Sequence, residues 1–250
     1  MLSTSVLILA AGHGKRMNSQ KSKVLHEIGG QPMIMHVYSS IKSLVSSLPI
    51  VVVGSNFEEI FDLMGSSVKY AFQDQPLGTG HAAMAAIDLL RGSTKQVVVM
   101  YGDMPLIRKN TIEKLILERE RNRATIAMIS IQGEPSSTFG RVIRDETGKV
   151  VEVIEWADAG KRENSKELLA IKELNAGLYC FDCEWFCENV GKIVPRPSRD
   201  YDEYYLTDIF RIAKNQRKLV IAINAEDEKE FFGISTKEDL AKAEEIYKSR

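Results

Sequence analysis

The sequence predicts an α/β fold, in which a mixed, mostly parallel sheet is flanked by helices and carries an inserted β-rich part. Residues 5–9, 50–54 and 96–100 contain continuous apolar runs, which are typical of strands buried on both faces. Segments with helical spacing of apolar residues separate these runs, and this alternation implies parallel pairing with right-handed crossovers. From residue 139 two short strand patterns follow each other with no helix between them, which predicts a hairpin.

Length and charge restrict the kind of protein. The 250 residues suffice for a domain that buries its own core, and 33 Lys plus Arg against 34 Asp plus Glu leave a formal net charge of -1. This balance gives no electrostatic case for a nucleic-acid or membrane partner. No apolar run approaches a membrane span and no signal-peptide pattern opens the chain, so we expect a cytoplasmic enzyme. A monomer or weak homo-oligomer is expected.

The first expected strand, residues 5–9, leads into a glycine loop. Gly12 and Gly14 can adopt backbone angles closed to other residues, so that successive N–H groups turn inward around an anion. Arg16 and Lys23 add cations close by. An ordinary strand-to-helix turn is the alternative; the spacing excludes the dinucleotide fingerprint, and no Gly-Lys-Ser/Thr follows to make a P-loop. We predict a phosphate-binding loop at the carboxyl end of this strand.

Helices are expected over residues 32–45, 57–64, 81–90 and 110–123, and a last helix follows residue 235. Ser55 and Asn110 each precede a glutamate by three residues, as in a capping box, and Thr79 can cap the third helix. Ser235 with Glu238 predicts a similar box at the last helix. Further strands are expected over residues 124–131 and 219–225.

Two loops next to expected strands carry candidate binding groups. Gln73 presents both a donor and an acceptor, as the edge of a pyrimidine base requires, and a plain loop is the alternative. Asp103 leaves the strand 96–100 on the same edge as the glycine loop, where a carboxylate can hold a hard divalent cation against phosphate oxygens. A turn or a helix cap is the alternative role of this aspartate.

The cysteines Cys180, Cys183 and Cys187 lie within eight residues. Their spacing offers no second pair of ligands and no nearby histidine, and an odd number argues against a disulfide framework. We expect reduced packing residues rather than a zinc site.

Several motifs together resemble the sugar-phosphate nucleotidyltransferases, in particular the N-acetylglucosamine-1-phosphate uridylyltransferases. The motifs are Leu-Ala-Ala-Gly-x-Gly-x-Arg-Met with Lys-Val-Leu-His, Pro-Leu-Gly-Thr-Gly-His-Ala, Tyr-Gly-Asp and Glu-Tyr-Tyr-Leu-Thr-Asp. The resemblance implies a Rossmann-like fold. It also implies catalytic roles for Arg16 and Lys23, and Mg²⁺ held by Asp103.

The resemblance assigns the remaining site residues by their position in the motifs. The implied nucleotide-binding residues are Leu9, Ala10, Ala11, Gly12, Gly14, Gln73, Gly78 and Thr79. The implied sugar-binding residues are Tyr101, Gly102, Gly140, Glu155 and Asn175. Ser235 stands where the family has an asparagine as second metal ligand, Ser22 where it usually has a proline, and Trp156 where it tends to have a histidine.

The implied organisation is a single nucleotidyltransferase domain over residues 1–250. Its nucleotide-binding part is expected at about 1–133 and 201–250, with a sugar-binding insert at about 134–200. The implied reaction joins UTP and N-acetylglucosamine 1-phosphate into UDP-N-acetylglucosamine and pyrophosphate, a step toward cell-wall precursors. Another base or sugar phosphate, or a catalytically silent nucleotide-sugar binding protein, remain alternatives. No hexapeptide repeat is present, so no acetyltransferase β-helix is expected.

Overall fold

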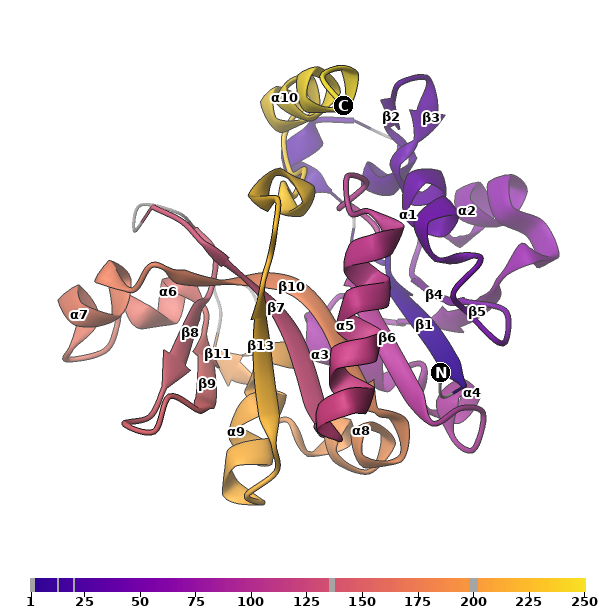
Figure 1. Cartoon of the computed structure of the whole chain (residues 1–250). Coiled ribbons are helices and arrows are strands. Elements are labelled where there is room, and N and C mark those ends of the chain that lie inside the picture. The colour runs from indigo at the N-terminus through magenta and orange to yellow at the C-terminus, as the bar shows by residue number, and fades with distance from the viewer. Residues whose placement is uncertain (1–2, 13, 20, 135–137, 198–201) are drawn as a thin grey trace.

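A mixed sheet organises the chain in the computed structural model, which describes residues 3–12, 14–19, 21–134, 138–197 and 202–250 (Figure 1). Among these residues, nine strands join in one sheet. Seven follow one another in the order β13 (Val220–Asn224), β7 (Ile126–Gln132), β10 (Glu173–Asp182), β6 (Gln96–Tyr101), β1 (Thr4–Leu9), β4 (Ile50–Val53) and β5 (Lys69–Phe72). The hairpin β8 (Arg141–Arg144) and β9 (Val150–Ile154) extends from β10.

In the seven-strand order, four of the six neighbouring pairs run parallel, as the sequence predicts. β1 pairs in parallel with β4 and β6, β4 with β5, and β7 with β13. The carboxyl ends of β1, β4, β5 and β6 therefore lie at one edge. β10 runs antiparallel between β6 and β7, although its residues fall within the range 134–200 expected as an insert. The predicted hairpin is confirmed; it joins the sheet through β10 and lies on the same side of the molecule as α6 (Trp156–Ala159) and α7 (Ser165–Ala170) (Figure 1).

Helices cover both faces of the sheet because its strands are apolar on both faces. In β1, Leu7 and Leu9 pack toward one face and Val6 and Ile8 toward the other, as expected from the alternation of side chains along a strand. The first face is covered by α3 (Thr79–Met84), α4 (Ile87–Leu90), α8 (Cys183–Asn189) and α9 (Ile209–Asn215). The second face is covered by α1 (Met33–Ile41), α2 (Phe57–Met64) and α5 (Lys109–Asn122).

Short elements complete the described chain. α10 (Lys237–Lys248) lies near the carboxyl edge of the sheet and packs with Ile28 and Leu106 (Figure 1). The short strands are β2 (Glu27–Ile28), β3 (Gln31–Pro32), β11 (Arg196–Pro197) and β12 (Asp202–Glu203). Single 3₁₀ turns occur at Lys15–Met17, Lys23–Leu25, Gly65–Ser67, Val190–Lys192, Leu206–Asp208 and Glu228–Phe231. No described helix is both long and apolar enough to cross a membrane.

None of the four predicted caps, Ser55, Asn110, Thr79 and Ser235, is the N-cap of its helix. α2 and α5 begin after Asn56 and Arg108, and neither N-cap side chain bonds to the helix. Thr79 lies inside α3 rather than before it, and its hydroxyl accepts a hydrogen bond from the N–H of Leu206 at 3.0 Å. The hydroxyl of Thr79 therefore bonds to the backbone of Leu206, which is distant in the sequence, instead of capping the helix. The helix expected over 81–90 is also divided into α3 and α4.

The last helix has a capping box, but it is shifted by one residue. Thr236, not Ser235, is the N-cap, and its hydroxyl accepts from the N–H of Asp239 at 3.1 Å. The carboxylate of Asp239 accepts in return from the N–H of Thr236 at 2.9 Å. This shift leaves the hydroxyl of Ser235 available to the neighbouring loop.

The three cysteines are buried free thiols: Cys180 lies in β10, and Cys183 and Cys187 lie in α8. Cys183 and Cys187 pack in the core together with Phe186, as expected of packing residues. A hydrogen bond from Cys187 lowers the pKa of the Cys183 thiol to about 7, whereas burial raises the pKa of Cys180 to about 12.

Candidate active site

A cavity of about 620 Å³ opens at the carboxyl edge of the parallel strands. It lies where β1 ends at Leu9 and β6 ends at Tyr101. Its lining residues are Leu9, Ala10, Ala11, Gly12, Gly14, Arg16, Lys23, Val24, Gln73, Pro76, Gly78, Thr79, Ala82, Tyr101, Asp103 and Ser235. The structure therefore brings together the predicted glycine loop, the predicted base loop and the predicted metal ligand in one cavity.

Lys23 and Asp103 meet within this cavity. The Nζ of Lys23 forms an ion pair with Oδ2 of Asp103, and the two side chains are only 16% and 21% exposed. Lys23 also packs closely on Gly14, which only a glycine allows. The φ of Gly14 is +62°, and a Cβ there would lie 2.5 Å from the Cβ of Lys23. The glycine loop and the lysine are thus folded against each other, and Asp103 faces both.

Arg16 enters the same cavity from the other side of the glycine loop. Its Nη2 donates to the hydroxyl of Ser235 at 3.3 Å. The neighbouring Ile234 donates its N–H to the carbonyl of Asp103 at 3.2 Å, which fixes the segment before α10 beside the aspartate. Two cations and one carboxylate consequently line one cavity, an arrangement suited to a polyphosphate and its counterion.

The loop that contains Gln73 and Gly78, which the sequence predicts to bind the base, lines another part of the cavity. Gln73 is buried, and its Nε2 donates to the carbonyl of Gly78 at 3.0 Å. Gly78 has φ +100°, and a Cβ there would lie 2.6 Å from the carbonyl of Tyr204. Because the N–H of Tyr204 also donates to Leu77 at 2.8 Å, the segment after β12 holds this loop in place.

Four predicted site residues do not line this cavity: Gly102, Gly140, Glu155 and Asn175. Gly102 is buried directly beneath it, where a Cβ would lie 3.1 Å from Val24. The side chain of Asn175 donates to the hydroxyl of Tyr179 at 2.7 Å and faces Gly140.

Tyr101 links the cavity to the other predicted sugar residues. Burial raises its pKa, and the negative charges of Glu155 and Asp103 raise it further, so this tyrosine stands near both carboxylates. The carboxylate of Glu155 accepts from the hydroxyl of Thr207 at 2.7 Å, and burial raises its pKa. Whether Glu155 and Asn175 contact a sugar stays a prediction.

The surroundings of Asp103 fit a hard cation whose other ligands are water and substrate phosphates. Within the described ranges, no three His, Cys, Asp or Glu side chains are grouped as a metal site. Mg²⁺ is commonly held by one or two carboxylates, with waters and substrate phosphates filling the remaining positions. Asp103, partly exposed in a cavity with Arg16 and Lys23, suits that mode of binding.

Several cavity residues escaped the sequence analysis. Val24, Pro76 and Ala82 line the cavity with apolar side chains. Only their places in the motifs could have indicated this. Asn56 is buried behind the glycine loop and donates to the carbonyl of Ala10 at 2.9 Å. Its position just after β4, on the same edge as the glycine loop, could have revealed it.

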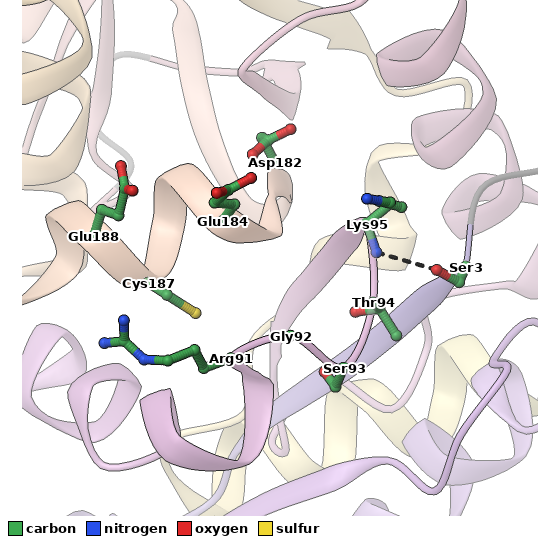
Figure 2. A pocket seen from close by; sticks show the side chains of 10 residues that line it. All are labelled: Ser3, Arg91, Gly92, Ser93, Thr94, Lys95, Asp182, Glu184, Cys187 and Glu188. Carbon is green, nitrogen blue, oxygen red and sulfur yellow. Dashed lines mark hydrogen bonds between the residues drawn. The ribbon is translucent and has the colours of Figure 1, made fainter.

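A second cavity of about 440 Å³ lies at the opposite edge of the sheet (Figure 2). There the N–H of Lys95 donates to the hydroxyl of Ser3 at 3.1 Å. Glu184, Cys187 and Glu188 of α8 also line the cavity, and both carboxylates point away from Arg91 (Figure 2). Charges of both signs line it, and it contains none of the predicted site residues. The first cavity is therefore the candidate active site.

Comparisons with known proteins place the chain among nucleotidyltransferases. Residues 6–174 match the family model described as MobA-like NTP transferase domain. A bifunctional protein GlmU from Acetivibrio thermocellus is 41% identical over 245 residues, which cover 98% of this chain and 51% of that protein. GlmU from Clostridium kluyveri is 40% identical over 247 residues, covering 98% and 52%. The chain thus spans about half the length of these curated relatives.

Two solved structures share the fold at low sequence identity. A putative glucose-1-phosphate thymidylyltransferase from Bacillus anthracis, in complex with sucrose, has a TM-score of 0.73 at 17% identity, covering 99% of this chain and 96% of that one. A UDP-glucose pyrophosphorylase complexed with UDP-glucose has a TM-score of 0.74 at 16% identity, covering all of both chains. These likenesses confirm the predicted fold class.

Proposed function

Because this chain belongs to the MobA-like NTP transferase family, we propose that it joins UTP and N-acetylglucosamine 1-phosphate into UDP-N-acetylglucosamine and pyrophosphate. The similarity to GlmU relatives over 98% of this chain supports this choice of substrates. The contact between Lys23 and Asp103 beside the glycine loop is the observation that supports the chemistry most directly.

We propose that the glycine loop and its cations bind the triphosphate. Backbone N–H groups from Gly12 and Gly14 would face the phosphates, and the guanidinium of Arg16 would match phosphate oxygens with its planar fork of donors. Lys23 would act as a point charge beside them. Gln73 and Gly78, at the other end of the cavity, would read the edge of the base.

The proposed transfer is an in-line displacement. An oxygen of the sugar 1-phosphate attacks the α-phosphorus, a new P–O bond forms, and the bond to the bridging oxygen breaks, so that pyrophosphate leaves with that electron pair. The nucleophile is already ionised, so no general base is required. Arg16 and Lys23 would stabilise the charge that develops on the phosphates.

A divalent cation completes this proposal. Asp103 would hold Mg²⁺, and Ser235, which also lines the cavity, would be a second, weaker oxygen ligand. When bound, the ion would supply positive charge that offsets the negative charge of the phosphates. Lys23 would then exchange its ion pair with Asp103 for phosphate oxygens.

The sugar would lie toward the hairpin β8 and β9. Glu155 and Asn175 carry carboxylate and amide groups of the kind that bind sugar hydroxyls, and Tyr101 lines the cavity. We propose that residues 134–200 provide this side of the site within one domain. Trp156, which is 43% exposed beside Glu155, stands where the resembling family tends to have a histidine, so sugar preference deserves direct measurement.

The test is incubation of the purified protein with UTP, Mg²⁺ and N-acetylglucosamine 1-phosphate. We expect release of pyrophosphate and formation of UDP-N-acetylglucosamine. A panel with other nucleoside triphosphates and other sugar 1-phosphates separates a different specificity from this one. Binding of nucleotide without release of pyrophosphate from any pair would contradict catalysis and indicate a nucleotide-sugar binding protein.

A further inference from the structure

We propose that Asn56 is a positioning residue for Lys23, acting through Ser22, which Glu59 also holds by a hydrogen bond. These three residues form a hydrogen-bonded network directly behind the glycine loop, and none of them lines the cavity. The proposal rests on the function proposed for Lys23. It adds that the geometry of the lysine is set from the turn between β4 and α2.

Asn56 ties three segments together with one buried amide. Its Nδ2 donates to the carbonyl of Ala10, at the end of β1, and to the hydroxyl of Ser22, each at 2.9 Å. Its Oδ1 accepts from the N–H of Gly54 at 2.9 Å. Asn56 is only 8% exposed and Ser22 only 5%, so these hydrogen bonds are shielded from competing water.

Ser22 uses all of its polar groups in this network and in the turn that follows. Its N–H donates to a carboxylate oxygen of Glu59 at 3.2 Å, and its carbonyl accepts from the N–H of Leu25 at 3.0 Å. Its backbone angles, φ -52° and ψ 139°, are those a proline would adopt. Hydrogen bonds therefore impose here the conformation that a proline ring would impose covalently.

The next residue is Lys23, so the network acts on the lysine at once. Lys23 begins the 3₁₀ turn Lys23–Leu25, and its amine reaches across the cavity to Asp103. If Asn56 is removed, the hydroxyl of Ser22 and the carbonyl of Ala10 lose their common donor, and this segment is free to shift. A displacement of about 1 Å is enough to lower turnover about 100-fold in an active site that works by positioning.

Two variants of Asn56 and a restoring variant test this role. Asn56→Ala removes the amide, and Asn56→Asp preserves its shape but cannot donate to Ala10. Ser22→Pro, combined with Asn56→Ala, restrains the backbone before Lys23 without the amide, because φ of Ser22 already suits proline. Asn189→Ala is the matched control, since Asn189 is 2% exposed, makes three side-chain hydrogen bonds as well, and lies on α8 away from the cavity.

Steady-state kinetics provide the first measurement. We expect kcat to fall about 10- to 100-fold in both Asn56 variants with little change in KM for the sugar phosphate. The double variant should recover at least half of the decrease in log kcat caused by Asn56→Ala. Asn189→Ala should keep the wild-type kcat even if its melting temperature falls as much as that of Asn56→Ala. If Asn56 only stabilises the fold, kcat should fall in proportion to stability in all variants, and Ser22→Pro should not restore kcat. That result overturns the proposal.

Hydrogen exchange over residues 21–26 provides a measurement that needs no turnover. Loss of Asn56 should speed exchange in this segment, and Ser22→Pro should slow it again at the remaining amides. If the wild-type protein releases no pyrophosphate with any substrate pair, the proposed function fails, and this exchange measurement alone decides the positioning role. Unchanged exchange in both Asn56 variants overturns it.

Discussion

Replacing Lys23 by alanine should damage turnover far more than folding. The amine of Lys23 pairs with Asp103 inside the cavity, close to the glycine loop proposed to bind the triphosphate. In the folded protein without substrate, its removal costs one ion pair. In the transition state, its removal costs a cation placed where negative charge develops.

The two costs can be compared in magnitude. The side chains of Lys23 and Asp103 are 16% and 21% exposed, so water reaches the pair, and a loss of about 1 kcal/mol in the free energy of unfolding is expected. A charge-stabilising donor lost from a preorganised site typically lowers kcat about 100- to 1000-fold, equivalent to about 2.7 to 4 kcal/mol. The increase in activation free energy should therefore be at least twice the loss in the free energy of unfolding.

Pyrophosphate release and urea unfolding, measured on the same preparations, give the two quantities. Lys21→Ala is the matched control: it removes the same charge two residues earlier, where Lys21 is 46% exposed and pairs with Glu27 at 3.5 Å. The control should keep wild-type kcat. Folded Lys23→Ala protein with wild-type kcat, or with a loss no larger than that of the control, would refute the role assigned to Lys23.

Three further predictions concern the same cavity and its neighbourhood. Asp103→Asn should lower kcat on the order of 1000-fold and abolish its dependence on Mg²⁺ concentration, because the cation loses its carboxylate; titration of Mg²⁺ in the turnover assay measures this. Gly14→Ala should lower both stability, by about 1 to 3 kcal/mol, and kcat, because φ is +62° and the new Cβ would strike Lys23. Gly30→Ala, with φ +77° and open space around it, should strain the backbone yet keep kcat. Glu155→Gln should flatten the dependence of stability on pH above about 4.5, as measured by urea unfolding at a series of pH values.

The sign of the Glu155 prediction follows from proton binding. Burial raises the pKa of this carboxyl above its ordinary value of 4.5, so the folded protein holds the proton more tightly than the unfolded chain. Stability contributed by the protonated form is present at low pH and is lost as pH rises from 4.5 through the folded-state pKa. A wild-type protein and a Glu155→Gln variant with parallel pH profiles would contradict this reasoning.

The core strands and the site edge were predictable because their signals are local. Continuous apolar runs identify β1, β4 and β6, and the rule that parallel strands end at one edge places Asp103 near the segment after β1, where it pairs with Lys23, 80 positions away in the chain. The antiparallel place of β10 was not predictable in this way. An apolar strand looks the same whichever direction its neighbours run.

The details that the sequence analysis missed depend on distant partners. Thr79 has the residue type of a cap, but Leu206 takes its hydroxyl. Ser235 has the spacing of a cap, but Thr236 forms the capping box, and the hydroxyl of Ser235 accepts a hydrogen bond from Arg16. Asn56 carries no motif, and only the fold shows that it joins the end of β1 to the segment before Lys23.

The central claim is that Arg16, Lys23 and Asp103 converge on one triphosphate. A crystal structure with Mg²⁺ and a non-hydrolysable UTP analogue tests it most directly. We predict that the phosphates lie between the glycine loop and Asp103, with Mg²⁺ on that carboxylate and the amine of Lys23 turned from Asp103 to phosphate oxygen. A triphosphate bound outside this cavity, or an ion bound away from Asp103, would contradict it.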